Sequence, residues 1–422
     1  MKDFYSLTEV ADMLSVSKET LRRWDKNGSL KPIRHPINNY RVYPVSALKQ
    51  FEQLGFLFKT KKNEQVEPLR DYTIIELFSG AGGLALGLDK AGFNCVLLND
   101  NDRNACETLK KNRPDWNVIE GDVAKIDFLP FKGKVDVVAG GFPCQAFSYA
   151  GKKLGFKDTR GTLFYEFARA IKEVQPLICV GENVRGLFNH ENGKTLQGMI
   201  SVLDELGYDV LPPQVLKAMF YRVPQKRERL LIVGLKRGAG LSFDYPAPHK
   251  EIFTLKDALK KGRLYNRDVS ASAGQAYSAK KSQIMKHVPP GGYWRDLPLK
   301  LQKEYMQKSF YLGGGKTGIA RRMHWDEPCL TLTCNPAQKQ TERCHPVETR
   351  PFTVREYARI QTFPDDWHFV GSLSSQYKQI GNAVPVNLGI EIGYSLIRCL
   401  NVYYSKNVVA KKKQRKKNDS ET

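Results

Sequence analysis

The stretch Glu76-Leu77-Phe78-Ser79-Gly80-Ala81-Gly82-Gly83 decides the fold class of this chain. It ends an apolar run from Thr73 to Phe78 that is typical of a β-strand, and a helical pattern follows from Leu84 to Ala91. Glycines between a strand and a helix let a nucleotide-like ligand approach backbone that Cβ atoms would otherwise shield. Gly80-x-Gly82-x-x-Ala85 also satisfies a dinucleotide fingerprint, so an NAD enzyme and a purely structural turn both stay open here.

Strands and helices alternate after this turn. Strands are expected at 95–98, 135–139, 177–180 and 230–233, and helices at 164–174 and about 388–400. This βαβ rhythm predicts an α/β, Rossmann-like domain with a mostly parallel sheet and helices on both faces. Asp100 follows Gly80 by 20 residues, where it can accept hydrogen bonds from a ribose.

Composition limits the class of protein. A chain of 422 residues with 41% hydrophobic content suggests two or three domains. The formal net charge of +22 selects no fold, but it favours polyanionic partners such as nucleic acid. The N-terminus lacks the apolar core of a signal peptide, and no stretch is long enough to span a membrane. Eight scattered cysteines indicate reduced thiols, so we expect a cytoplasmic protein.

Residues 1–58 are expected to form a separate head. Two short helices meet at a tight turn near Val16-Ser17, and the second helix carries Lys18, Arg22, Arg23 and Lys26. A strand-like segment at 39–43 would form a wing. This stretch resembles the winged helix-turn-helix head of MerR-type regulators, which implies contact with DNA. An accessory helical domain with a solvated basic face is the alternative.

Composition shifts divide the rest of the chain. A polar linker is expected at 59–70 and the α/β domain at 71–235. The βαβ rhythm then stops. Residues 251–350 hold 18 Lys and Arg against 9 Asp and Glu, so a smaller, irregular region suited to nucleic-acid contact is expected at 236–350. The α/β domain resumes at 351–404, and a basic, disordered tail is expected at 405–422.

A second motif follows the strand at 135–139. Gly140-Gly141-Phe142-Pro143-Cys144-Gln145 places a cysteine at the carboxyl end of a parallel strand, where open α/β sheets hold their ligands. A lone cysteine there is more often packing than nucleophile. The proline and glycines around Cys144 form an exposed, rigid loop instead, which favours a nucleophile.

Two further motifs supply charged groups. Glu182 leaves an apolar strand end within Gly181-Glu182-Asn183-Val184, so its pKa should be raised and it can donate a proton. A capping or salt-bridged carboxylate is the alternative. In Gln225-Lys226-Arg227-Glu228-Arg229, strand alternation places both arginines on one face. They would repel each other unless an anion or an electron-rich ring lay between them, and a solvated charged face is the alternative.

These motifs together resemble the DNA (cytosine-5) methyltransferase family of bacterial restriction-modification systems. The resemblance covers about residues 72–400 except the basic insert. It implies that 71–235 and 351–404 form the catalytic and cofactor-binding domain and that 236–350 is the target-recognition region. It rests on FSGAGG, GFPCQ, ENV and QKRER in this order, followed by Arg355-Glu356-x-x-Arg359-Ile360-Gln361-Thr362-Phe363-Pro364 and Gln379-Ile380-Gly381-Asn382-Ala383-Val384-Pro385.

The resemblance implies a covalent mechanism. The thiolate of Cys144 would add to cytosine C6, which makes C5 nucleophilic toward the methyl group of S-adenosylmethionine. Glu182 would bond or protonate N3 of the base, and Arg227 and Arg229 would hold the base and its developing charge. The sequence does not indicate which group removes the C5 proton.

The resemblance also implies the residues that bind S-adenosylmethionine. The methionine part would lie among Phe78, Gly80, Gly82 and Gly83. Asp100 would take the ribose, Asp122 and Val123 the adenine, and Pro143, Leu163 and Asn382 the remainder. Asn101 stands where the family often has an aromatic residue, which puts adenine stacking there in doubt.

Double-stranded DNA is the expected partner, and a monomer is expected to act on it. A paired base cannot reach Cys144, so the target cytosine must be flipped out, and the region 236–350 would supply the groove contacts that select it. Cys329, Cys334, Cys344 and His345 lie in this region, but their spacing matches no zinc pattern, so no metal is expected. The resemblance further implies a cognate restriction endonuclease as a genetic partner and a nucleoid-associated enzyme.

Two alternatives remain from other classes. A DNA-binding regulator with a vestigial methyltransferase domain would explain the head and the charge, but not why Cys144, Glu182, Arg227 and Arg229 are all present. An RNA cytosine methyltransferase of the same fold is disfavoured by the large basic insert and the head. The NAD enzyme is disfavoured because it gives no task to Cys144.

Overall fold

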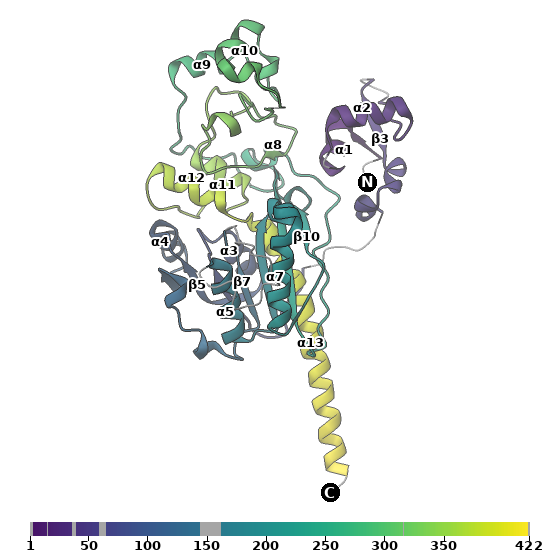
Figure 1. Cartoon of the computed structure of the whole chain (residues 1–422), viewed down its shortest axis with the longest axis vertical. Coiled ribbons are helices and arrows are strands. Elements are labelled where there is room, and N and C mark those ends of the chain that lie inside the picture. Colours follow the sequence, from purple (N-terminus) through teal and green to yellow (C-terminus); the bar gives the residue numbers. More distant parts are fainter. Residues whose placement is uncertain are drawn as a thin grey trace. The chain divides into compact units, whose positions relative to one another are not determined.

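The computed structural model describes residues 3–14, 16–35, 39–58, 65–143, 162–314 and 316–420, with the backbone alone from 407 onward. By its contacts the chain forms two compact units, which Figure 1 shows with their elements labelled. One unit is Met1–Glu64 with Ala247–Glu251, and the other is Gln65–Pro246 with Ile252–Thr422. The division falls inside the predicted linker. The region 236–350 was predicted as a separate domain. Apart from Ala247–Glu251, it belongs to the second unit.

The first unit has the expected helix-turn-helix and wing. Helix α1 (Leu7–Leu14) and helix α2 (Lys18–Asn27) precede the strands β2 (Ile33–Arg34) and β3 (Arg41–Pro44), and β3 also pairs with β1 (Phe4–Ser6). The side chain of Ser17 caps α2 by accepting from the Thr20 N–H, and Gly28 ends it in the left-handed conformation. Leu21 is the buried residue of α2, so most of this helix faces outward.

The second unit is built on an eight-stranded sheet. Five strands form its parallel part, in the order β8 (Ile178–Val184), β7 (Val137–Gly140), β4 (Tyr72–Leu77), β5 (Phe93–Asp100), β6 (Val118–Glu120). β12 (Glu228–Lys236) pairs antiparallel with β8 and carries β9 (Tyr208–Val210) and β10 (Gln214–Lys217) on its far side. This confirms the prediction of a mostly parallel, Rossmann-like sheet.

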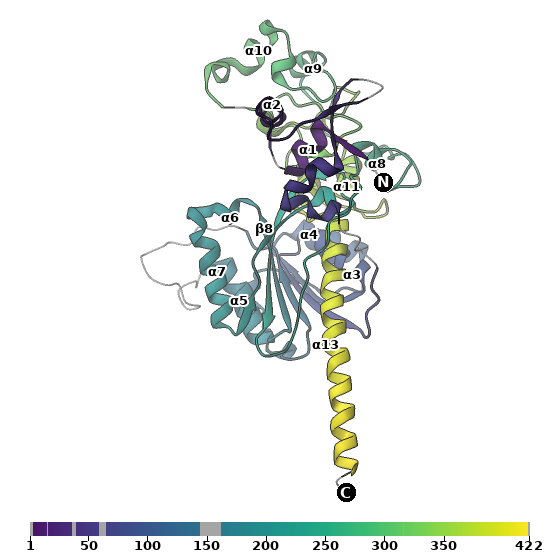
Figure 2. The ribbon, with the colours of Figure 1, turned by 90° about the vertical axis from the view of Figure 1, so that its right-hand side faces the viewer.

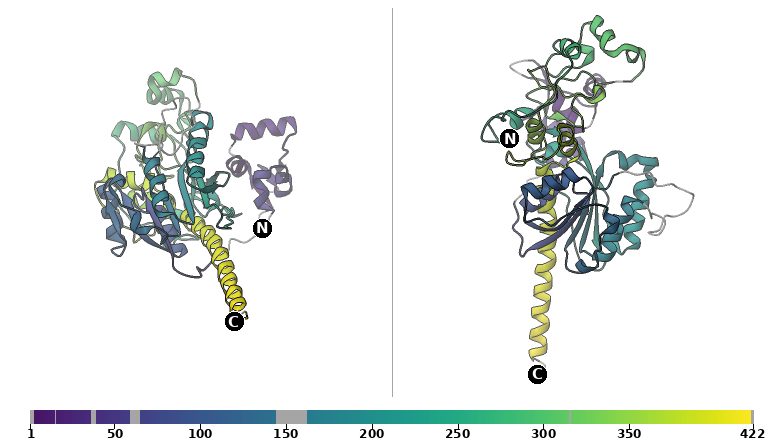
Figure 3. Two further views of the ribbon diagram at one scale, coloured as in Figure 1. Left: turned by 60° about the horizontal axis from the view of Figure 1, so that its bottom comes forward. Right: turned by 90° about the vertical axis from the view of Figure 1, so that its left-hand side faces the viewer.

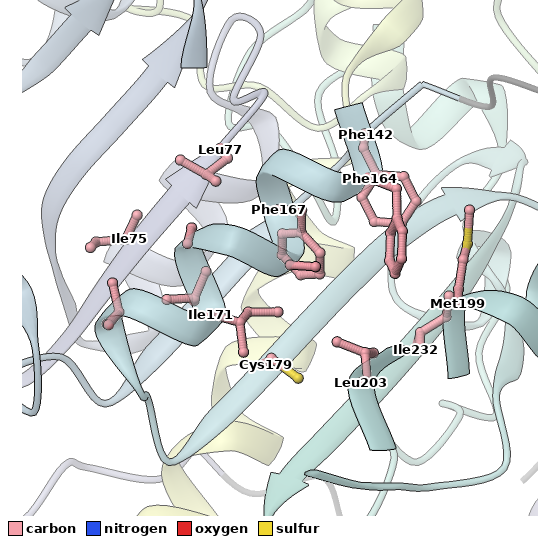
Figure 4. Packing of buried hydrophobic residues seen from close by; sticks show 14 of the residues in the cluster. Ile75, Leu77, Phe142, Phe164, Phe167, Ile171, Cys179, Met199, Leu203 and Ile232 are labelled. Atoms are coloured by element: carbon pink, nitrogen blue, oxygen red, sulfur yellow. The ribbon is translucent and has the colours of Figure 1, made fainter. Parts of the chain in front are cut away.

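Helices cover both faces of this sheet. Figure 2 and the right-hand view of Figure 3 place α5 (Leu163–Val174) and α7 (Lys194–Glu205) on one face, and α3 (Gly83–Ala91) and α13 (Val386–Ser420) on the other. The first face covers a hydrophobic core that contains Phe142, Phe164 and Phe167 together with Ile75 and Leu77 (Figure 4). Strand alternation points the intervening Glu76 away from this core.

Close contact of two glycines brings α13 onto α3. A Cβ atom on Gly87 of α3 would lie 2.6 Å from the Cα of Gly389 in α13. A real Cβ does not approach another atom so closely, so the two helices touch backbone to backbone. The last helix of the chain therefore packs directly against α3, the helix that follows the glycine turn.

The segment that follows β12 has a hydrophobic core of its own. It contains Trp294, Met306 and Cys344 with residues of α9 (Ala279–Met285) and α10 (Leu299–Met306). Arg322 is 3% exposed and donates to the carbonyls of Met285, Val288 and His345, among others. Part of the positive charge that predicted nucleic-acid contact is thus used inside the fold.

The segment 405–422, predicted as a basic, disordered tail, follows the last buried turns of α13 (Val386–Ser420). α13 continues through it to Ser420, as the yellow ribbon of Figure 2 shows. No glycine or proline follows Gly393, and Ala410, the lysines after it and Arg415 are good helix formers. An existing helix therefore continues through the tail, because each further residue adds a hydrogen bond without a new nucleus.

One stretch among the described residues, Leu373–Lys406, meets the length and hydropathy expected of a membrane-spanning helix. It joins α12 (Leu373–Asn382) to the first part of α13, and 78% of its most apolar window is buried in the fold. That burial is typical of a core helix.

Candidate active site

A cavity of about 900 Å³ opens at the carboxyl ends of the parallel strands. The strand order reverses between β4 and β7, and such a switch point is where open α/β sheets bind ligands. Most of the predicted site residues lie in its wall: Phe78, Gly80, Asp100, Asp122, Val123, Pro143, Leu163, Glu182, Arg227, Arg229 and Asn382. Cys144 lies outside the described residues, immediately after Pro143.

The glycine turn after β4 shapes one wall of the cavity. Gly80 has φ +53° and open space where a Cβ would lie, and its N–H donates to Asp100 Oδ2 at 2.8 Å. The other carboxylate oxygen of Asp100 accepts from the Asp102 N–H at 2.8 Å. Burial raises the pKa of Asp100. The carboxylate is held rigidly by backbone and faces the cavity, as the 20-residue spacing predicted.

Gly82 and Gly83, predicted beside the ligand, face other parts of the fold. A Cβ on Gly83 would lie 2.1 Å from the Val384 carbonyl oxygen, and one on Gly82 would lie 2.5 Å from Leu109 Cδ2. These glycines are required by the packing of the start of α3. Packing against Leu109 and Val384 therefore explains why both positions are glycine. The sequence pattern alone does not distinguish this packing role from ligand binding.

Asn99 is a supporting residue that sequence reasoning missed. It is buried, and its Nδ2 donates to the carbonyls of Ile119 at 3.0 Å and Gly121 at 3.1 Å. These bonds fix the loop that leads from β6 to Asp122 and Val123. Asn99 therefore positions the predicted adenine side of the cavity.

Glu182 and Arg229 form a buried ion pair across two strands. The antiparallel register sets Leu231 opposite Glu182 and Arg229 opposite Val184, so the two side chains meet at the open end of the sheet. Arg229 Nε lies 2.5 Å from Glu182 Oε1. Burial raises the pKa of Glu182, and Arg229 opposes that rise. The pair thus presents a carboxyl that can carry a proton beside a fixed positive charge.

Arg227 has different partners. It is 1% exposed, and its guanidinium donates to the carbonyls of Gly381 at 2.8 Å, Asn382 at 3.3 Å and Leu332 at 3.3 Å. The repulsion expected between two neighbouring arginines is therefore relieved separately, by carbonyls at Arg227 and by Glu182 at Arg229. Arg227 links β12 to both later segments of the cavity wall.

The loop that carries Pro143 is tied to the strand that carries Glu182. Asn183 Nδ2 donates to the Phe142 carbonyl at 2.8 Å. A Cβ on Gly141 would lie 3.1 Å from Glu182 Oε2, so a side chain at Gly141 would press on the carboxylate. The buried side-chain amide of Asn183 therefore anchors the loop up to Pro143 beside Glu182.

The last motif lines the cavity from Gly381 to Val384, and the motif before it supports that segment. Arg359 is fully buried in α11 (Val354–Ile360) and bonds Asp365 at 2.8 and 2.7 Å. Gln361 donates to the carbonyls of Ile380 at 2.7 Å and Ala383 at 3.1 Å, which holds the segment around Asn382.

The cysteines of the insert have different environments. Cys334 reaches the cavity and its Sγ–H donates to Asn382 Oδ1 at 3.0 Å, whereas Cys329 and Cys344 are buried in packing. Within the part of the chain that the structure describes, no group of three or more His, Cys, Asp or Glu side chains could hold a metal ion.

Comparison with known proteins decides the family. The model of the C-5 cytosine-specific DNA methylase family matches residues 72–398. The type II methyltransferase M.Eco47II of Escherichia coli is 62% identical over 404 residues, covering 95% of this chain and 97% of that protein. The chain belongs to the C-5 cytosine-specific DNA methylase family. As a member of that family, it is a DNA cytosine methyltransferase of the type II class.

Other relatives of this methylase agree. M.PspPI of Psychrobacter is 57% identical, covering 94% of this chain and 96% of that protein, and M.Sau96I of Staphylococcus aureus is 47% identical, covering 94% and 89%. A crystal structure described as a DNA modification methyltransferase from an E. coli prophage covers 78% of this chain and is itself covered completely, with a TM-score of 0.61 and 24% identity. That likeness supports the methylase fold.

The head of the methylase also has a counterpart. The model of the MerR family of regulatory proteins matches residues 6–43. Because the match to M.Eco47II leaves about 5% of the chain uncovered, it extends over most of the N-terminal unit. The head is therefore shared with at least one type II relative.

Proposed function

We propose that this methylase transfers a methyl group from S-adenosylmethionine to C5 of a flipped-out cytosine in duplex DNA through an adduct with Cys144. The observation that carries this assignment is the buried Glu182–Arg229 pair, which lies in the same cavity wall as Pro143, the residue before the nucleophile. A proton-bearing carboxyl and a fixed cation are the groups needed to draw charge into the base while a thiolate adds.

Each residue has a defined task in this mechanism. The Cys144 thiolate adds to C6 while Glu182 gives a proton to N3, so the electrons of the 5,6 double bond become available at C5. C5 then takes the methyl group that the bound donor supplies. Loss of the C5 proton to a base reforms the double bond and expels the Cys144 thiolate, and N3 returns its proton to Glu182. Arg229, paired with Glu182, stabilises the charge that develops on the ring.

The donor is proposed to occupy the part of the cavity formed by the ends of β4, β5 and β6. Gly80 leaves room for it, Asp100 presents a carboxylate to its ribose hydroxyls, and Asp122 and Val123 border the adenine. Phe78, Pro143, Leu163 and Asn382 complete the wall. The cavity also presents acidic side chains, which suit a donor with a positively charged sulfonium and ammonium group.

The cell context follows from the type II relatives. We propose that the enzyme acts as a monomer on double-stranded DNA in the bacterial cytoplasm, associated with the nucleoid. Its methylation would shield the host sequence from a cognate restriction endonuclease, which is a genetic partner and not a bound one.

Turnover on defined nucleic acids tests the assignment. The full chain would be incubated with labelled S-adenosylmethionine and, separately, unmethylated duplex DNA or tRNA. We expect label in DNA at one recurring sequence, located by single-base detection of 5-methylcytosine. Cys144→Ser should transfer none while still binding the donor. Label in tRNA alone would establish the RNA enzyme, and no transfer to either would favour the regulator with a vestigial domain.

A second function is proposed for the head, on the strength of its MerR match and the outward face of α2. Arg22 and Arg23 lie on this helix, where they can reach the phosphates of a duplex. We propose that the head adds DNA affinity or represses a promoter, without taking part in methyl transfer.

Charge reversal in the full chain tests the head. Arg22→Glu/Arg23→Glu should weaken binding to DNA and lower the salt dependence of binding, while methyl transfer at saturating DNA stays at the wild-type rate. The matched control is Lys132→Glu/Lys134→Glu, which reverses two exposed cations before β7. Equal effects of the two double variants would argue against a DNA-binding role of the head.

A further inference from the structure

One arginine of the region 236–350 has no hydrogen-bonded partner for its side chain. Its chain neighbour Arg322 donates to the carbonyls of Met285 and Val288, at 2.7 Å in each case. For Arg321, by contrast, no hydrogen bond or ion pair of the guanidinium is found among the described residues, and its Nε atom is buried without a partner. Buried polar atoms are almost always paired, so an unpaired cation beside a well-bonded one calls for a specific reason.

The fold nevertheless holds the side chain of Arg321 in place. Its guanidinium carbon lies 5.8 Å from the centre of the Tyr293 ring, which supports it by a cation–π contact. Ala320, the residue before it, is fully buried with φ +47°, a left-handed conformation that costs an alanine free energy. The buried carboxylate of Glu342 fixes this turn by accepting from the Ala320 N–H. Arg321 as a whole is partly exposed, and Nε is its only side-chain nitrogen that is both buried and unpaired, so its two Nη atoms face outward.

Arg321 lies close to the wall of the catalytic cavity. Burial lowers the pKa of the Arg343 guanidinium, and the positive charge of Arg321 adds to that shift, so the two cations are neighbours. Arg343 donates to the Thr331 carbonyl at 3.0 and 2.7 Å, and Thr331 lines the cavity. Two cations side by side repel each other, and an electron-rich ligand at Arg321 would relieve this repulsion. A duplex whose cytosine enters the cavity brings such groups, its base edges and phosphates, to this part of the surface.

The geometry of the guanidinium narrows the choice of ligand. Its outward Nη groups are coplanar donors on a rigid fork, which suits a pair of acceptors in one plane. In the major groove, guanine presents two acceptors, N7 and O6, whereas each of the other bases presents at most one. A phosphate is the other candidate, but every nucleotide has one, so phosphate contact does not require a cation whose direction is fixed.

We propose that Arg321 is a specificity-determining residue that reads one guanine of the recognition sequence through N7 and O6 in the major groove, with Tyr293 as the platform that fixes its direction. The proposal goes beyond the proposed function, which names no residue that selects the sequence, and it rests on that function for duplex DNA as the substrate. Arg321 takes no part in methyl transfer itself, since the reacting groups lie in the cavity.

Base-resolved methylation tests the proposal. The wild-type chain and Arg321→Met would each methylate fragmented genomic DNA that carries no 5-methylcytosine, and the methylated cytosines would be located by sequencing with single-base detection. We expect the wild type to require a guanine at a fixed distance from its target cytosine. In Arg321→Met the preference for that guanine should fall about tenfold or more, with the other positions unchanged. Lys308→Met, which removes an exposed cation of the same region, is the matched control and should keep every preference.

A duplex with 7-deazaguanine at that position tests the contact itself, because this base lacks the N7 acceptor. The wild type should lose about fivefold or more in kcat/KM on this duplex, and Arg321→Met should lose nothing further. Tyr293→Leu keeps the charge but removes the platform, so it should weaken the same preference and no other. Calorimetry should show wild-type affinity for S-adenosylmethionine in all three variants, which excludes misfolding as a cause.

The outcomes separate this contact from the function of the enzyme. Equal losses of Arg321→Met at every sequence would make Arg321 a phosphate contact and would overturn the assignment to guanine. An unchanged profile, a wild-type recognition sequence without guanine, or a full further loss on the 7-deazaguanine duplex would overturn it as well. If Arg321→Met failed to bind the donor, Tyr293→Leu would decide, and a wild-type profile in that variant would overturn the proposal. Absence of methyl transfer from the wild-type chain to any duplex would instead contradict the proposed function, and this contact with it.

Discussion

Replacement of Arg227 by methionine would show whether this arginine has a structural or a catalytic role. The resemblance implied that Arg227 holds the target base, whereas its guanidinium donates to the carbonyls of Leu332, Gly381 and Asn382. Methionine keeps the apolar bulk and removes these donors. The expected result is a loss of fold stability and not a specific loss of chemistry.

The size of the effect follows from the contacts. A hydrogen bond to a charged group contributes roughly 1.5–3 kcal/mol, and a buried group left unpaired costs about 1–3 kcal/mol. One of the three bonds is short, at 2.8 Å, and two are long, at 3.3 Å. The buried charge also no longer has to be desolvated, which offsets part of the loss. We expect Arg227→Met to lower the free energy of unfolding by about 2–4 kcal/mol.

Urea unfolding followed by circular dichroism would measure this, with Arg229→Met as the matched control. Loss of Arg229 leaves Glu182 without its cation, but that carboxyl can take up a proton because burial already raises its pKa. At pH 6 we expect a smaller loss of stability in Arg229→Met, together with a loss of turnover. The reasoning is refuted if Arg227→Met unfolds like the wild type and binds S-adenosylmethionine normally, yet loses turnover as Arg229→Met does.

Three further outcomes follow from the geometry. Gly87→Ala should cost about 1–3 kcal/mol in urea unfolding because its Cβ would lie 2.6 Å from the backbone of α13, whereas Gly186→Ala, with its nearest neighbour at 3.9 Å, should cost little. Gly141→Ala should lower kcat by about tenfold or more, with donor affinity kept in calorimetry, because its Cβ would press on Glu182 Oε2. Burial, and then the charges of Glu182 and Asp100, raises the pKa of Glu76, so the folded state binds the proton more tightly than the unfolded chain. The wild type should therefore lose stability relative to Glu76→Gln as pH rises from about 4.5 through the folded pKa, and equal slopes in a pH series of unfolding curves would contradict this.

The sequence predicted the features that depend on local spacing. The glycine turn at Gly80 and the acid 20 residues later both follow from one strand, one turn and one helix, so the position of Asp100 was predictable. The parallel sheet followed from the same rhythm of strands and helices. Nothing in these patterns depends on contacts between distant segments.

Features that depend on register or on burial could not be predicted. Whether Arg227 or Arg229 meets Glu182 depends on how β12 pairs with β8, which the spacing of the motif does not specify. Burial is equally hard to predict at Arg321 and Arg322, which are adjacent residues of one type. Arg322 is bonded inside the fold, whereas Arg321 keeps an unpaired Nε atom.

The place where the catalytic unit begins and ends has a consequence for gene architecture. Leu69 donates its N–H to Asn401 Oδ1 at 3.1 Å, and Arg70 Nη2 donates to the Tyr404 hydroxyl at 2.6 Å, so the entry to β4 and the buried part of α13 lie side by side. A gene rearranged so that α13 precedes β4 through a short linker would encode the same sheet around the same cavity. The order of the segments in this sequence is therefore not the only order that is compatible with the fold. A circular permutant with its new termini in an exposed loop should be active.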